Sequence, residues 1–164
     1  MFGTNEKQQA LLADIASVSW DEMAAFIGPG ARFFEGPFSR MKAGAMEGKI
    51  PFWVGFSWAA LFFTFAWFWY RKMWLIGAAF LLTPIAFALL LPDVNGVTTG
   101  IAGAAAATGK RTYLTLGVQR IVAEREGRDL KNGFLYPSGG VSIPGALLGG
   151  FVFGLAIWAV FATA

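Results

Sequence analysis

The stretch IPFWVGFSWAALFFTFAWFWYRKMW, residues 50–74, decides how the rest of the chain is interpreted. From Phe52 to Tyr70 there is no charged side chain, and 11 of these 19 residues are Phe, Trp or Tyr. The run ends at Arg71-Lys72, and a second apolar stretch follows directly. A soluble core of 164 residues has little room for so much aromatic surface, whereas a lipid bilayer accepts it. The stretch therefore indicates a membrane protein.

The composition agrees with this interpretation and excludes several kinds of chemistry. Hydrophobic residues make up 56% of the chain and charged residues 14%, against roughly 25% charged residues in ordinary soluble domains. The chain has no Cys, which excludes disulfides, and no His, which removes the commonest general base and metal ligand. The net charge is +3, but the basic residues flank apolar segments and suit lipid headgroups better than nucleic acid. We expect no nucleic-acid partner, no metal and no cofactor.

The pattern divides the chain into two parts. Residues 1–49 form a soluble N-terminal arm with short amphipathic helices, one of them opened by a Ser19–Glu22 capping box. The segment ARFFEGPFSRMKAG in this arm lies on a membrane surface or a partner, or packs against the protein's own membrane domain. The membrane domain covers residues 50–164. Its helices are predicted at about 51–70, 73–91, 96–126 and 143–163, with a cytoplasmic loop at 127–142.

The aromatic helix 51–70 leaves two topologies open. It crosses the membrane fully, or it is embedded in the interface with both ends on one side. The arm before it carries Arg40, Lys42 and Lys49, and the positive-inside rule favours a cytoplasmic arm and therefore the second topology. The predicted fold is thus an all-α polytopic integral membrane protein with three transmembrane helices plus an embedded or interfacial aromatic helix. The alternative is four full transmembrane helices.

The segment beyond Thr112 is amphipathic, and its basic residues fix the predicted orientation. Its apolar side carries Leu114, Val118, Ile121 and Val122. Six Lys or Arg lie between Gly109 and Ser142, and none lies in the turn at 92–96. The N-terminal arm and residues 110–142 are therefore predicted to be cytoplasmic, with the C-terminus outside.

Two sets of residues are predicted to make contacts within the membrane domain, one with other helices and one with lipid headgroups. Small residues at intervals of three or four favour close helix contact, either within the chain or between copies. The predicted helix-packing interface consists of Gly96, Gly100, Gly103, Gly145, Gly149, Gly150 and Gly154. Aromatic and basic residues at the ends of apolar segments favour headgroup contact. The predicted lipid or interface anchors are Trp53, Trp58, Trp67, Trp69, Tyr70, Arg71, Lys72, Lys110 and Arg111.

The segment FSWAALFFTFAWFWYRKMW (Phe56 to Trp74) resembles the signature of a family of bacterial inner-membrane proteins, domain of unknown function number 2628. Members carry a Trp-Ala-Ala-Phe-Phe run followed by Trp-x-x-Tyr-Arg-Lys-Met. The chain matches at Trp58-Ala59-Ala60, at Phe62-Phe63 and at Trp67 to Met73, while Leu61 interrupts the aromatic run. The resemblance covers about residues 24–142. It implies a bacterial inner (cytoplasmic) membrane protein but supplies no activity.

The residues favour an accessory role over catalysis. No apolar segment carries paired carboxylates at helical spacing, and the chain has no Gly-x-Ser-x-Gly motif, so we do not expect an enzyme. A transporter would place polar groups at mid-membrane, and the segment 73–91 offers only Thr83. The predicted function is a small integral-membrane accessory or structural subunit that docks through Gly/Ala-rich helix faces onto a larger membrane complex. The alternative is a homo-oligomeric transporter or channel component. The expected partners are the lipid bilayer and other membrane-protein subunits, or further copies of the chain.

Overall fold

The computed structural model describes residues 3–90, 95–128 and 137–163, with side chains placed except at 3–5, 88–89, 95–98, 156–157 and 159–163. Among these residues the only regular elements are helices. They are α1 (Gly3–Ser17), α2 (Trp20–Ile27), the 3-10 helix η1 (Ala31–Phe33), α3 (Glu35–Met46), α4 (Trp58–Tyr70), α5 (Trp74–Leu90), α6 (Asn95–Arg125) and α7 (Ile143–Thr163).

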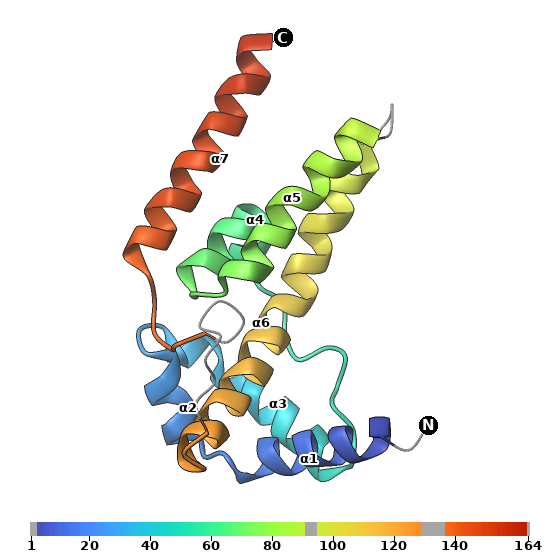
Figure 1. The fold of residues 1–164 in the computed structure, drawn as a ribbon, viewed down its shortest axis with the longest axis vertical. Coiled ribbons are helices and arrows are strands. Elements are labelled where there is room, and N and C mark those ends of the chain that lie inside the picture. The colour runs from blue at the N-terminus through green and yellow to red at the C-terminus, as the bar shows by residue number, and fades with distance from the viewer. Residues whose placement is uncertain (1–2, 91–94, 129–136, 164) are drawn as a thin grey trace.

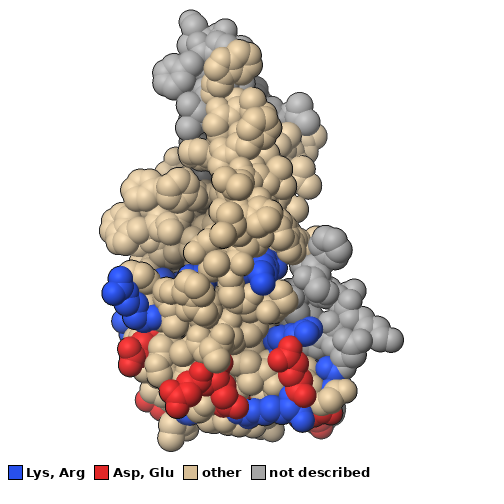
Figure 2. All heavy atoms as spheres, turned by 90° about the vertical axis from the view of Figure 1, so that its left-hand side faces the viewer, with Lys and Arg blue, Asp and Glu red and all other residues tan. Residues whose placement is uncertain are grey.

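The helices form two regions that share the long helix α6 (Figure 1). The lower region, here called the base, consists of α1, α2, η1, α3 and the C-terminal half of α6. The upper region, here called the apolar end, consists of α4, α5, the N-terminal half of α6 and α7. No Lys, Arg, Asp or Glu occurs at residues 52–70, 73–92, 94–109 or 143–163. Figure 2 shows the result on one face, where the charged side chains cover the lower part of the molecule.

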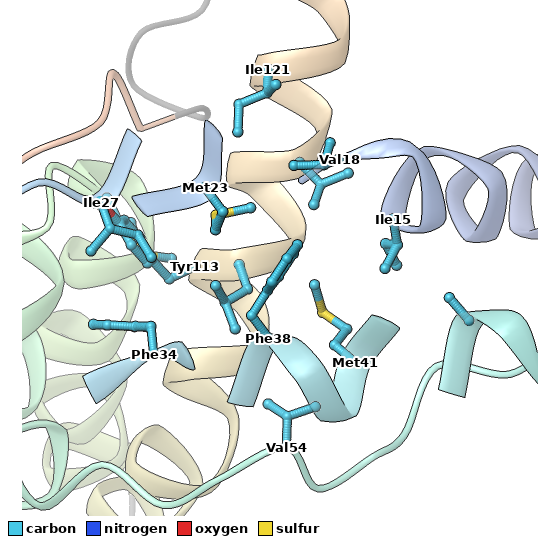
Figure 3. Packing of buried hydrophobic residues seen from close by; sticks show 14 of the residues in the cluster. Ile15, Val18, Met23, Ile27, Phe34, Phe38, Met41, Val54, Tyr113 and Ile121 are labelled. Atoms are coloured by element: carbon cyan, nitrogen blue, oxygen red, sulfur yellow. The ribbon is translucent and has the colours of Figure 1, made fainter. Parts of the chain in front are cut away.

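The base is held together by a core that joins the N-terminal helices to α6. Met23 of α2, and Phe38 and Met41 of α3, are buried and lie toward α6 (Figure 3). From α6, the apolar side predicted beyond Thr112 meets them, because its four residues Leu114, Val118, Ile121 and Val122 are all buried. Burial of such side chains stabilises by about 1.5–3 kcal/mol each, so the N-terminal segment is an integral part of the fold.

The aromatic residues of the segment ARFFEGPFSRMKAG pack mostly inside the protein. Phe34 and Phe38 are buried in the core of the base, whereas Phe33 is 60% exposed. The ring of Phe34 lies 5.4 Å from the ring of Tyr113 on α6. Of the two interpretations given to this segment, the structure therefore favours packing against the chain's own helices.

The capping box predicted at the start of α2 is present. The Ser19 hydroxyl accepts a hydrogen bond from the Glu22 amide at 3.3 Å, and the Glu22 carboxylate accepts one from the Ser19 amide at 2.8 Å. The same carboxylate forms an ion pair with Arg125 at the end of α6. These bonds lower the pKa of Glu22 from 4.5 to about 2, with the Arg125 contact as the largest cause. One surface side chain thus fixes α2 against α6.

Acid should release this connection, and Glu22→Gln isolates the contribution of the charge. Because the folded-state pKa lies below the ordinary value, the carboxylate stabilises the fold above about pH 4.5, and this stability is lost as the pH falls toward 2. A Gln keeps the cap and loses the ion pair. We expect the variant to be less stable than the wild type at pH 7 and to show a shallower loss of stability between pH 4.5 and 2, measured by chemical unfolding at each pH. Glu6→Gln, on the exposed side of α1, removes the same charge as a control. Parallel stability curves for wild type and Glu22→Gln would contradict the prediction.

The aromatic stretch does not form one continuous helix. Residues 51–57 are irregular, and α4 begins at Trp58, where the Ser57 hydroxyl caps it by accepting from the Ala60 amide at 3.2 Å. The Ser57 amide in turn donates to the Ala106 carbonyl of α6 at 3.0 Å. Thr64 interrupts α4 with φ 33° and ψ −106°, a strained conformation for a β-branched residue. The expected helix 51–70 is therefore shorter and broken.

These bounds bear on the predicted membrane topology. Within the part of the chain that the structure describes, no helix has both the length and the apolar character needed to cross a membrane. The α4 helix is short and broken, α5 has 17 residues against the ~20 that a bilayer requires, and the apolar part of α6 ends at Lys110-Arg111. The prediction of a polytopic integral membrane protein, with three transmembrane helices and an embedded aromatic helix or with four transmembrane helices, is therefore wrong. The described chain is all-helical.

Candidate functional site

A cavity of about 760 Å³ lies where the base meets the apolar end. The irregular segment before α4, the turn before η1, and helices α4, α6 and α7 contribute to its walls. Aromatic residues are the largest group in the lining, and they are Phe33, Phe34, Phe56, Trp58, Phe63, Trp67 and Tyr70. Small residues of α4 and α7, among them Ala66, Ala146 and Gly150, leave the space open. The volume falls in the range of about 300–1,000 Å³ that is typical of small-molecule sites.

Arg71 provides the first charge at this cavity and is nearly enclosed by protein. It ends α4 and is only 5% exposed. Its Nη1 donates to the Ile27 carbonyl at 3.4 Å, while its Nε is buried without a hydrogen-bond partner. Its guanidinium lies over three rings, with its central carbon 4.8 Å from the centre of Phe34, 5.3 Å from Tyr70 and 5.4 Å from Tyr113. Cation–π contact offsets part of the cost of burying the charge.

Lys110 of α6 provides the second charge. Its Nζ donates to the Phe33 carbonyl at 3.1 Å and lies 5.7 Å from the centre of the Phe34 ring. Burial lowers the pKa of Lys110, and the positive charges of Arg40 and Arg71 lower it further. Two cations therefore line one cavity and repel each other.

The ion pairs of the described residues all lie away from this cavity. They join Lys49 to Glu47, Arg120 to Glu124, Arg125 to Glu22 and Arg128 to Glu126. Neither Arg71 nor Lys110 takes part in one of these pairs. One further cation lies close by, because the charge of Arg40 acts on Lys110. The cavity is consequently electropositive without a carboxylate of the described chain to balance it.

Tyr113 forms the inner support of the site. It is fully buried on α6 between the rings of Phe26, Phe34 and Trp67, with centroid distances of 5.8, 5.4 and 6.5 Å. Its hydroxyl is the second buried polar group of the described residues without a hydrogen-bond partner. Burial raises the pKa of Tyr113, and the nearby Arg71 acts in the opposite direction through its charge and through a side-chain contact with the hydroxyl that does not have the geometry of a normal hydrogen bond. The phenol therefore stays protonated at neutral pH.

The structure brings five of the nine predicted anchor residues together around the cavity. These are Trp58, Trp67, Tyr70, Arg71 and Lys110. The other four lie outside its lining: Trp53 is exposed, Trp69 donates to the Trp74 carbonyl at 3.1 Å, Lys72 adopts a left-handed turn and Arg111 lies over the Phe52 ring.

The predicted packing glycines separate into two groups. Gly145 and Gly149 lie against α4. A Cβ on Gly145 would lie 2.6 Å from the Trp69 carbonyl oxygen, and a Cβ on Gly149 would lie 2.6 Å from the Ala66 Cβ. Added Cβ atoms at the remaining described positions would meet no atom within 4 Å, and these positions are Gly100, Gly103, Gly150 and Gly154. The surroundings of Gly96 lie outside the described residues. The first group packs within the chain, and the second is open to the outside.

The apolar end also carries an exposed apolar surface. Large apolar side chains of α4, α5 and α7 are exposed there without a charged residue among them. They are Trp58, Phe62 and Phe63 of α4; Leu75, Leu82, Ile85, Phe87 and Leu90 of α5; and Ile143, Leu147, Leu148, Phe151, Leu155 and Trp158 of α7. Monomeric soluble proteins rarely expose apolar patches larger than a few hundred Å². Exposed apolar patches of this kind mark sites of contact with other molecules.

Several features of the site were missed by the sequence reasoning. The contact of Phe34 with Arg71 joins residues nearly forty positions apart, and no local pattern marks it. Gly109 and Gly117 also pack closely, because a Cβ added to them would lie 3.1 Å from the Trp67 ring and 2.7 Å from the Phe26 ring. Their spacing on α6 is eight residues, which a search for intervals of three or four overlooks.

Comparison with known proteins found no relative of this chain. No family model, no curated protein and no solved structure matches it. The likeness to the family of unknown function stays a prediction. Among the described residues there is also no group of three or more His, Cys, Asp or Glu that could hold a metal ion. The site is accordingly interpreted from its own chemistry.

Proposed function

We propose that the chain is an accessory or structural subunit that other protein subunits hold by its apolar end. The observation that carries this proposal is the exposed apolar surface of α4, α5 and α7. Surfaces of this composition are typical of the centres of permanent interfaces, where charged residues are depleted and aromatic residues enriched. The charged base remains in water, which leaves it accessible to further contacts.

The open glycines support a helical partner. Gly100 and Gly103 on α6 and Gly154 on α7 leave space in which a second helix can approach closely. The distance between two packed helices depends on the side chains at their contact, and small residues shorten it. A partner with apolar helices of its own would therefore fit this surface better than a flat or charged one. A second copy of the chain is the competing occupant.

A charge placed on this surface should release the partner without unfolding the chain. Leu147 of α7 is 70% exposed, so Leu147→Glu buries no charge within the chain itself, but would bury one in an interface. We expect the variant to lose the co-purifying subunits that the tagged wild type retains when isolated from its native cells in mild detergent. Mass spectrometry identifies those subunits, and circular dichroism checks the fold.

Met46→Glu is the matched control for this experiment. Met46 is 77% exposed but lies at the end of α3 in the base. It should leave the complex intact. Retention of every partner by Leu147→Glu, at wild-type stoichiometry, would overturn docking through α7. Recovery of a homo-oligomer alone would replace a foreign subunit by a second copy, and recovery of lipid alone would refute a protein partner.

A further inference from the structure

We propose that the cavity at the foot of the apolar end binds one amphiphilic anion, a carboxylate or phosphate head on an alkyl chain. The head would lie between Arg71 and Lys110, and the chain would lie along the aromatic wall. This inference concerns the cavity, which shares only Trp58 and Phe63 with the exposed apolar surface proposed for docking.

The case for an anionic head begins with Arg71. Its side chain lines the cavity while more than nine-tenths buried, and its Nε–H has no acceptor. A buried N–H donor without an acceptor is costly, and a buried charge without a counterion costs more. Arg is also the residue best suited to bind carboxylate or phosphate oxygens through paired N–H groups. A bound anion would supply both the acceptor and the missing countercharge.

Lys110 strengthens the preference for an anion. Its ammonium group lines the same cavity, and its charge is disfavoured there by burial and by its cationic neighbours. An anion between the two side chains would convert a repulsion into two attractions. An uncharged ligand would leave the repulsion in place, and a cationic one would increase it.

The case for an alkyl chain rests on the rest of the lining. Beyond Arg71 and Lys110 the wall consists mainly of aromatic rings and small apolar side chains. Trp58 is 66% exposed and Phe63 is also exposed, so apolar surface at the cavity is still open to water. A chain laid against these rings would remove that surface from water, which stabilises by about 25 cal/mol per Å². A small hydrophilic anion would leave it uncovered.

The binding experiment uses the full-length chain in one uncharged detergent and follows the quenching of tryptophan fluorescence, because Trp58 and Trp67 line the cavity. The probes are 12-bromododecanoate and 12-bromododecyl phosphate, whose bromine quenches indole on contact. We expect saturable one-to-one binding of the charged probes. The uncharged 12-bromododecanol should bind about tenfold or more weakly, since it lacks the charge-assisted hydrogen bonds. Tighter binding of the phosphate would indicate a phospholipid-like ligand, and tighter binding of the carboxylate a free fatty acid.

Two pairs of variants locate the site. Lys110→Gln should weaken binding of the charged probes about tenfold, whereas Lys49→Gln, a substitution at a side chain 73% exposed, should not. Gly150→Leu should fill the cavity and abolish binding of every probe, whereas Gly154→Leu, one turn further along α7, should leave it unchanged. Both glycines have open space for a side chain, but only Gly150 lines the cavity.

Arg71→Met separates a binding role from a structural one. It should reduce the discrimination between bromododecanoate and bromododecanol to the part that Lys110 supplies, while the midpoint of thermal unfolding stays the same or rises, because a buried unpaired charge is removed. Equal affinity of the wild type for the alcohol and the acid would overturn the anionic head. Competition by acetate or inorganic phosphate as strong as by dodecanoate would overturn the chain. Unchanged binding by Gly150→Leu would overturn the cavity as the site.

Discussion

Replacing Tyr113 by Ala should lower the free energy of unfolding by about 3–5 kcal/mol, the range found when large buried aromatic side chains are truncated. Tyr113 is fully buried, and its ring contacts those of Phe26, Phe34 and Trp67, which come from α2, the segment after η1, and α4. Truncation leaves a cavity among three elements that cannot collapse together. Chemical unfolding followed by circular dichroism measures the loss.

Tyr113→Phe is the matched control, and it should behave very differently. The hydroxyl is buried without a hydrogen-bond partner, so its removal deletes a polar group that gains nothing from being enclosed. We expect the Phe variant to be as stable as the wild type or more stable by up to about 1 kcal/mol. If Tyr113→Phe instead lowered the free energy of unfolding by more than about 1 kcal/mol, the hydroxyl would have a hydrogen-bond partner in solution. A loss for Tyr113→Ala no larger than for a surface substitution would contradict the central position of this ring.

The position of Tyr113 explains why one side chain has so much influence. Helix α6 runs through both the base and the apolar end (Figure 1), and Tyr113 lies on it just beyond Lys110-Arg111. On one side its ring contacts the base, through Phe26. On the other it contacts α4 through Trp67 and lies beneath the Arg71 guanidinium. The same ring therefore supports the fold and the wall behind the cavity.

Local patterns predicted the helical parts of this chain that local chemistry controls. The Ser19–Glu22 capping box was visible because its two residues stand three positions apart and satisfy each other. The apolar side of α6 was visible because Leu114, Val118 and Ile121 recur at helical spacing, and the structure buries all three. Such signals can be detected without knowing which other helix packs against the segment.

The prediction of the membrane topology was wrong because it depended on features that local patterns do not show. Hydropathy identified residues 51–70 as one apolar segment, but it carries no information on where a helix begins or breaks. The start of α4 is fixed by a bond of the Ser57 amide to the Ala106 carbonyl of α6, and Thr64 adopts a strained conformation that hydropathy does not reveal. Likewise, Arg71 was interpreted as a headgroup anchor because it follows an aromatic run. Its burial results from η1 and α6 converging on the end of α4, a long-range arrangement that no spacing reveals.

The glycines show the same division within a single helix. From the sequence, Gly149 and Gly150 of α7 are equivalent members of overlapping small-residue motifs. In the structure a Cβ on Gly149 would lie 2.6 Å from the Cβ and 2.8 Å from the Cα of Ala66, whereas one on Gly150 would meet no atom within 4 Å. Only the first is required for α7 to reach α4.

Gly149→Leu should therefore separate α7 from α4. The obstacle is partly backbone, which cannot rotate aside, so we expect a loss toward or above the upper end of the about 1–3 kcal/mol typical of overpacking. Gly150→Leu, the same change one residue later, should be neutral or stabilising by up to about 1 kcal/mol, because Leu favours a helix more than Gly does. Hydrogen exchange along residues 143–155 would detect the separation directly.

In this experiment Gly149→Leu should exchange faster throughout the segment, and Gly150→Leu should not. Equal exchange in both variants would mean that α7 does not rest on α4 through Gly149. The cavity between these helices would then lack its α7 wall, so this pair of variants also tests the geometry on which ligand binding depends.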